Sequence, residues 1–158
     1  KNNFIEYYDR KALFETIKLI NKKDNIDLII KLHPSMNKDT IPDLKDCKVV
    51  DSKSSINTFQ LMKSADLILT LVSSALLDGL LLHKKLGILT YVTNFHSIVA
   101  DRIKEINIRS LNDLEIFIDN NNLLNQKTID HNILNFYSEI VSNENQNIEF
   151  NYFKYLNN

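Results

Sequence analysis

Apolar residues recur at helical and strand spacings along most of the chain. Between residues 9 and 22 they fall three and four positions apart, which predicts a helix with one buried face (Leu13, Phe14, Ile17, Ile20). Residues 27–32 form a short run rich in branched aliphatic side chains that ends before a proline, which predicts a buried strand. A surface helix therefore leads into a strand.

The same alternation continues beyond this strand. Residues 47–50 predict a second short strand, and residues 56–65 predict a helix that Ser54 or Ser55 could cap at its N-terminus. Residues 66–71 read as a strand that is apolar on both faces, which is typical of parallel sheets covered by helices.

The second half of the chain predicts further elements of both kinds. The expected elements are a nearly all-apolar helix (74–83), two strands (86–92 and 106–108) and two further helices (111–119 and 128–141). Strand and helix thus alternate about five times. This pattern predicts an α/β fold with a Rossmann-like, doubly wound parallel sheet of about five strands and helices on both faces.

The length of the chain fits one globular domain. Of its 158 residues, 44% are hydrophobic and 25% are charged. We assign residues 1–142 to one Rossmann-like domain and residues 143–158 to a polar and aromatic tail. The sequence starts with Lys1 instead of methionine, which favours a piece of a longer protein.

The charge and cysteine content limit the possible binding partners and the cellular compartment. Lys and Arg total 19 against 20 Asp and Glu, so no overall positive field attracts nucleic acid. The single cysteine, Cys47, cannot form an internal disulfide and is compatible with a reducing compartment. The most apolar run, 67–82, is shorter than the roughly 20 residues of a membrane-spanning helix. We expect a cytoplasmic protein, with peripheral association at the inner face of the membrane open to the full-length protein.

The dipeptide His33-Pro34 closes the predicted strand 27–32. Ligands of open parallel sheets bind outside the carboxyl ends of the strands. Pro34 restricts His33 to extended backbone conformations, so the imidazole can leave the strand end in few directions, and it can donate a hydrogen bond to a phosphate oxygen. The alternative is that His33 ends a strand and bonds a backbone carbonyl.

Ser73 and Ser74 stand between a predicted strand and a predicted helix. Unpaired amides and the positive end of the helix dipole make such a position an anion site, and the two hydroxyls add donors. Serine is also an ordinary N-cap residue, which needs no ligand. Asp78 shares a helical face with Ser74 and could accept hydrogen bonds from ribose or alditol hydroxyls, or hold the serines in place.

A third polar group follows the strand 47–50. Ser54 and Ser55 end the run of residues 52–55, which belongs at the same sheet edge and is an additional candidate for nucleotide contact. A plain surface loop has the same composition. Lys31 and Lys38 are interpreted as solvated lysines.

Four segments together resemble the C-terminal domain of GT-B glycosyltransferases that make bacterial capsules, lipopolysaccharide or teichoic acid. The segments are 28–34 (LIIKLHP), 65–70 (ADLILT), 73–78 (SSALLD) and 84–89 (KKLGIL). Two branches are most similar: CDP-glycerol glycerophosphotransferases, and bacterial sialyltransferases and polysialyltransferases with paired HP and SS motifs. The chain departs from the former at 71–72, where Leu-Val replaces Asp-Tyr, and near Lys85.

The resemblance implies that the chain is the donor-nucleotide-binding half of a bacterial transferase. By this likeness His33, Ser73 and Ser74 contact the donor phosphate, and His33 is the candidate catalytic residue; Pro34, Thr70 and Asp78 complete the site. The donor would be CMP-, CDP- or UDP-linked. The glycan or lipid-linked acceptor would bind a further N-terminal domain, and the catalytic acid or base would lie outside this chain.

No Asp-x-Asp and no cluster with metal-ligand spacing occurs, so we expect neither a tightly bound metal nor another cofactor. His33 and the serines would then stabilise the negative charge on the departing nucleotide phosphate. Two other hypotheses stay open. One is a UDP-sugar 2-epimerase, which shares the architecture, and the other is a non-catalytic nucleotide-binding module.

Overall fold

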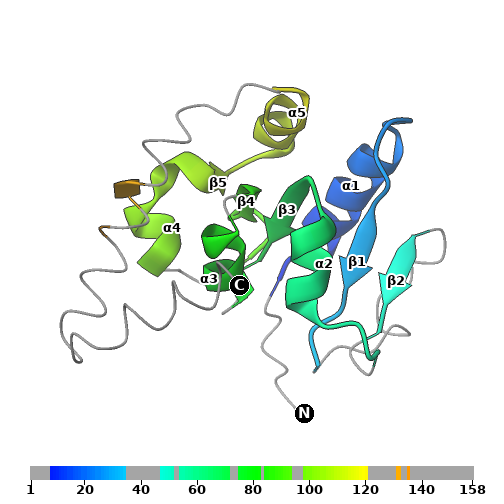
Figure 1. Ribbon diagram of the computed structural model, residues 1–158. Helices are drawn as coiled ribbons and strands as arrows, with labels where there is room; N and C mark the ends of the chain where they lie inside the picture. The colour runs from blue at the N-terminus through cyan, green and yellow to red at the C-terminus, as the bar shows by residue number, and fades with distance from the viewer. Residues whose placement is uncertain are drawn as a thin grey trace, which may run out of the picture.

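Helices and parallel strands alternate along the chain (Figure 1). The computed structural model describes residues 8–34, 47–51, 54–71, 75–82, 84–93, 98–120, 131–132 and 135. The strands are β1 (Ile29–Lys31), β2 (Lys48–Val50), β3 (Leu67–Thr70), β4 (Lys85–Leu89) and β5 (Asn107–Ile108). The helices are α1 (Arg10–Asn21), α2 (Thr58–Ser64), α3 (Ala75–Leu81), α4 (Ile98–Arg102), the 3-10 helix η2 (Lys104–Ile106) and α5 (Leu111–Asp119).

The described strands form two small parallel sheets. In one, β1 pairs with β2 so that Lys31 is opposite Val50; in the other, β3, β4 and β5 are joined in that order, with Thr70 opposite Ile88. Figure 1 shows the strands in the order β5, β4, β3, β1, β2 across the view. The α/β class and the parallel pairing predicted from the sequence are confirmed.

Alternate residues of β3 and β4 pack on opposite sides of the three-stranded sheet. Ile68, Leu86 and Ile88 belong to a core that also holds residues of α2, α3, α4 and η2, whereas Leu69 and Leu89 face α1 and α5. Helices cover both sides of this sheet, which explains why residues 66–71 are apolar on both faces, as predicted from the sequence.

Helix α1 packs against both sheets. Its Ile20 lies in the core with β3, β4, β5 and α5, and its Ile17 packs with residues of β1 and β2. Leu28, which precedes β1, contacts both of these clusters. Apolar packing on α1 thus connects the two hydrogen-bonded sheets.

Helices α1 and α5 match their predictions closely. Each begins after a polar side chain that accepts a hydrogen bond from a first-turn amide: Asp9 from Ala12 (3.0 Å) and Ser110 from Asp113 (3.0 Å). Such caps satisfy amides that have no partner within the helix, and they fix where the helix begins.

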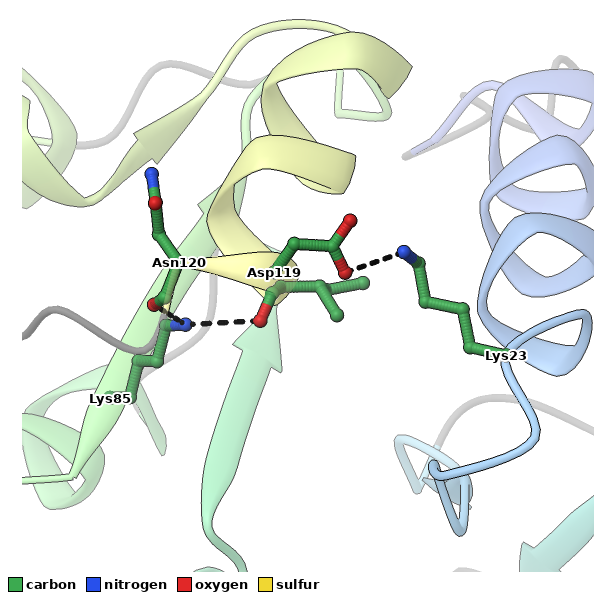
Figure 2. Close-up of polar contacts among 5 residues, drawn as sticks. Lys23, Lys85, Asp119 and Asn120 are labelled. Carbon is green, nitrogen blue, oxygen red and sulfur yellow. Dashed lines mark hydrogen bonds and ion pairs between the residues drawn. The ribbon is translucent and has the colours of Figure 1, made fainter.

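The C-terminal end of α5 is held by two lysines, which Figure 2 shows. The Lys85 ammonium donates to the carbonyl of Asn120 (2.7 Å) and to that of Ile118 (3.4 Å), and it lies over the Phe117 ring. Lys23, just beyond α1, pairs with Asp119 at 2.6 Å. Desolvation lowers the pKa of Lys85, and the Asp119 charge opposes this shift. The first residue of β4 thereby caps α5.

Three predicted details differ from the structure. Helix α2 is capped by Asn57, whose capping box with Gln60 replaces the predicted Ser54 or Ser55 cap. Strand β4 ends at Leu89, because the Thr90 amide turns back to the Ile88 carbonyl at 2.9 Å. The predicted buried strand β1 carries Ile29, which is 46% exposed.

The connection between β4 and β5 contains α4 and η2, which the sequence patterns did not indicate. Ala100, Ile103 and Ile106 are buried there at a spacing of three residues. The last predicted helix, 128–141, is described only at residues 131–132 and 135, where it is helical. The tail 143–158 lies outside the described residues. No helix in the described part of the chain has the length and apolar character needed to cross a membrane.

Candidate functional site

The carboxyl ends of neighbouring strands meet at a common edge in each sheet. Lys31 of β1 is opposite Val50 of β2, and the Leu32 amide extends this ladder to the Val50 carbonyl (3.1 Å). In the other sheet, Thr70 of β3 is opposite Ile88 of β4. Parallel pairing therefore brings the ends of β1 and β2 together, and likewise those of β3 and β4.

His33 and Pro34 lie directly beyond the carboxyl end of β1. Leu32, the residue before them, is 3% exposed and packs with Ile17 of α1. The buried leucine fixes the end of the strand, and the next two residues, His33 and Pro34, are exposed. His33 therefore lies at the surface, next to the carboxyl end of β1.

The loop from β2 to α2 contains Ser54 and Ser55 at the same edge. Ser54 Oγ accepts a hydrogen bond from the Ile56 amide (3.2 Å), and the Ser54 amide donates to the Asp51 carbonyl (3.1 Å). These bonds make Ser54 a turn-forming residue, although its hydroxyl proton stays free of them. Ser55 is exposed.

Lys31 is not the solvated lysine that the sequence suggested. It is half-buried, and its ammonium donates to the carbonyls of Asp51 (2.7 Å) and Ile56 (3.2 Å). The lysine of β1 therefore contacts the first residue of the β2–α2 loop and the residue before the α2 cap. The sequence offered one signal for this role of Lys31: it is the only charged residue of β1 and stands at the end of that strand.

Thr70 and Asp78 flank the predicted phosphate site on the second sheet. Thr70 Oγ1 donates to the Leu71 carbonyl (2.7 Å), so its hydroxyl must break this bond before it can donate to a phosphate. Asp78 is half-buried in the first turn of α3, and no described residue forms a hydrogen bond or ion pair with its carboxylate. Ser73 and Ser74 lie outside the described residues, so their binding of one phosphate together with His33 stays a prediction.

The turn after β4 is fixed by contacts with β5 and with α1. The Thr90 amide and hydroxyl both donate to the Ile108 carbonyl of β5 (2.9 Å each), and the Asp9 amide, at the start of α1, donates to the Val92 carbonyl (2.7 Å). The Tyr91 hydroxyl is hydrogen-bonded to that of Thr16 within α1. This carboxyl-end turn is therefore rigidly placed.

Burial governs the ionisation of Tyr91. Desolvation raises its pKa, and so does the nearby Glu15 carboxylate. Thr16 is 2% exposed. Sequence reasoning passed over this pair, although Thr16 lies on the apolar stripe of the helix, three residues after Leu13.

Among the described residues, no three His, Cys, Asp or Glu side chains gather where they could hold a metal ion. What the described edge offers a ligand is an exposed imidazole, serine hydroxyls and the Lys31 ammonium. These groups donate hydrogen bonds, which suits an anionic or polyhydroxylated ligand.

Comparisons of the chain with protein-family models, with curated proteins and with solved structures found no match.

Proposed function

We propose that the chain binds the nucleotide of an activated donor and forms the C-terminal half of a GT-B glycosyltransferase or glycerophosphotransferase of bacterial surface-polymer synthesis. In this proposal the two small sheets are parts of one doubly wound, Rossmann-like sheet. The full enzyme works in the cytoplasm, where it transfers a sugar or alditol phosphate from a CMP-, CDP- or UDP-linked donor.

The observation that carries the proposal is the position of His33. The buried Leu32 directly follows β1, and the next residue, His33, is exposed at the carboxyl edge of a parallel pair. This edge is where parallel α/β sheets bind nucleotides. Ser54 lies beyond the end of the neighbouring strand β2, and the ammonium of Lys31, the last residue of β1, donates to the Asp51 carbonyl at that end, so hydrogen-bond donors are present at this edge.

The chemistry required of these residues is electrostatic. When the bond between the donor group and its nucleotide breaks, negative charge grows on the departing phosphate. His33, with Ser73 and Ser74 from the loop before α3, would donate hydrogen bonds to that oxygen, and fixed donors stabilise such charge strongly. Asp78, on the first turn of α3, would accept hydrogen bonds from hydroxyls of the ribose or the alditol.

Calorimetric titration of the chain with CMP, CDP, UDP and GDP tests the proposal. We expect saturable binding of at least one pyrimidine nucleotide, and an affinity about tenfold lower in His33→Ala, the loss that corresponds to one charge-assisted hydrogen bond. His131→Ala is the matched control, because His131 is an exposed histidine bonded to Asn135 in another part of the chain. Binding of none of the four nucleotides by the wild-type chain would refute the proposal.

In the full-length enzyme, His33→Ala is expected to lower kcat by on the order of a hundredfold, the typical loss for one such donor. Product analysis then separates the alternatives. A transferred glycosyl or glycerophosphoryl group supports the proposal, a 2-epimerised sugar nucleotide indicates the epimerase, and binding without turnover indicates a nucleotide-binding module.

A further inference from the structure

Lys31 is a half-buried cation whose described contacts are all with neutral groups. Its ammonium donates to two backbone carbonyls, those of Asp51 and Ile56. The ion pairs of the described residues involve other lysines (Lys11, Lys23 and Lys48). Because a carbonyl oxygen carries only a partial charge, the full positive charge of Lys31 remains available to a ligand.

The two carbonyls lie at opposite ends of the β2–α2 loop. Asp51 is the first residue after β2, and Ile56 directly precedes Asn57, the cap of α2. Between them, the Ser54 amide also donates to the Asp51 carbonyl, and the Ile56 amide donates to Ser54 Oγ. A single ammonium therefore bridges the start and the end of a loop whose internal hydrogen bonds depend on that spacing.

The charge lies close to the proposed phosphate position. His33 follows Lys31 by two residues, a rise of about 6.6 Å in an extended chain, which is within one Debye length at physiological salt. The loop bonds use two of the three donors of an ammonium. The exposed Asp51, whose carbonyl accepts from Lys31, also carries a carboxylate, which opposes anion binding in part.

We propose that Lys31 is a positioning residue of the nucleotide site. It holds Asp51 and Ile56, the two ends of the β2–α2 loop, together, and its uncompensated charge favours the phosphates of a nucleoside diphosphate over an uncharged nucleoside. The second part rests on the proposed function. The first part holds for the chain whether or not it binds a nucleotide.

Two measurements on Lys31→Met test the two parts separately. Hydrogen exchange at the Ser54 and Ile56 amides is expected to accelerate five- to tenfold, roughly the effect of losing one hydrogen bond. Affinity for CDP is expected to fall about tenfold, which equals 1.4 kcal/mol, while any affinity for cytidine stays unchanged. Lys48→Met is the matched control, since Lys48 lies on the adjacent strand and pairs with Asp27 (2.6 Å), and it should alter neither quantity.

The outcomes distinguish this inference from the proposed function. Unchanged exchange at both amides would overturn the role of Lys31 in ordering the loop. If the wild-type chain binds CDP and Lys31→Met binds it with equal affinity, the role of Lys31 toward the ligand is overturned, while its role in the loop stands. A wild-type chain that binds no nucleotide would refute the proposed function and the ligand role with it. If Lys31→Met does not fold, Lys31→Ala, which also removes both the donor and the charge, replaces it in both measurements.

Discussion

The hydroxyl of Tyr91 is hydrogen-bonded to that of Thr16, a residue 75 positions earlier in the chain. Thr16 donates its own proton to the Ala12 carbonyl (2.7 Å), so Tyr91 is the donor in the pair. The bond connects the middle of α1 to the turn that follows β4. A tertiary contact between two hydroxyls thus helps to place the carboxyl end of β4.

Tyr91→Phe should lower the free energy of unfolding by about 1 kcal/mol, because it removes one hydrogen bond and leaves Thr16 still bonded to Ala12. Urea denaturation followed by circular dichroism measures the change; the chain has no tryptophan to report on unfolding. Tyr8→Phe is the control, since no described residue hydrogen-bonds to the Tyr8 hydroxyl. Equal effects of the two substitutions would contradict a stabilising role for the Thr16 contact.

The same tyrosine predicts a pH dependence. The folded chain raises the pKa of Tyr91 above its ordinary value of 10.0, chiefly by desolvation, so the folded state binds the phenolic proton more tightly than the unfolded state. The resulting stabilisation is fully present below pH 10 and is lost as the pH rises through the folded pKa. The stability difference between wild type and Tyr91→Phe should therefore shrink from pH 9 to pH 11. A constant or growing difference would be inconsistent with burial as the cause.

Gly87 of β4 leaves little space between its backbone and the side chains of β3, β5 and α5. A Cβ at this position would stand 2.5 Å from Ile108 Cδ1, 3.1 Å from Phe117 Cε1 and 3.2 Å from Leu69 Cδ2. We expect Gly87→Ala to cost about 1–3 kcal/mol, as overpacked cores usually do.

Gly79→Ala is the matched control for this substitution. Its nearest contact would be Leu86 Cδ1 at 3.2 Å, and alanine favours the helix by up to about 1 kcal/mol over glycine, which offsets the crowding. Thermal unfolding of both variants checks the comparison. A Gly79→Ala variant that is less stable than Gly87→Ala would show that the sheet face beneath α5 is not the tighter one.

The cap of α2 can be tested against the serines that precede it. Asn57→Ala removes the side chain that accepts from the Gln60 amide (2.9 Å) and should cost about 1 kcal/mol. Ser55→Ala should change stability by less than about 0.5 kcal/mol, because Ser55 is exposed and lies outside the capping box. If Ser55→Ala lowers the free energy of unfolding in urea more than Asn57→Ala does, the serine cap that the sequence suggested is supported instead.

Lys85 should control the end of α5 more than it controls overall stability. Lys85→Met removes the donor to the Asn120 and Ile118 carbonyls, although methionine keeps an apolar chain beside Phe117. We expect faster hydrogen exchange at the Asn120 amide, which donates to Ile116, and little change at Leu114 in the buried part of the helix. Lys23→Met, which breaks an ion pair with a 60% exposed Asp119, should have a smaller effect.

Local sequence signals were sufficient to predict a helix or strand wherever nearby residues set its boundaries. The 111–119 helix was predicted with its full bounds from its apolar spacing, and the structure shows Ser110 as the cap at its start. Parallel pairing followed from strands that are apolar on both faces. The position of His33 followed from Pro34, which closes the strand that precedes it.

Tertiary contacts decided the features that the sequence did not reveal. Strand β4 ends three residues early because Thr90 bonds to the Ile88 and Ile108 carbonyls. The role of Lys31 depends on carbonyls 20 and 25 residues away, which no local pattern can indicate. Asn57 was passed over as a cap because Ser54 and Ser55 carry the same signal, and the Gln60 side chain decides between them.

The central claim is that His33 and the Ser73-Ser74 loop bind one phosphate together. Titration of the isotope-labelled chain with CDP, followed by NMR at the His33 imidazole and at the Ser73 and Ser74 amides, tests it most directly. The account predicts that all three signals shift and saturate with a single Kd, while the imidazole of His131 does not respond. Shifts at His33 without shifts at the serines, or saturation of the two sites at different CDP concentrations, would contradict it.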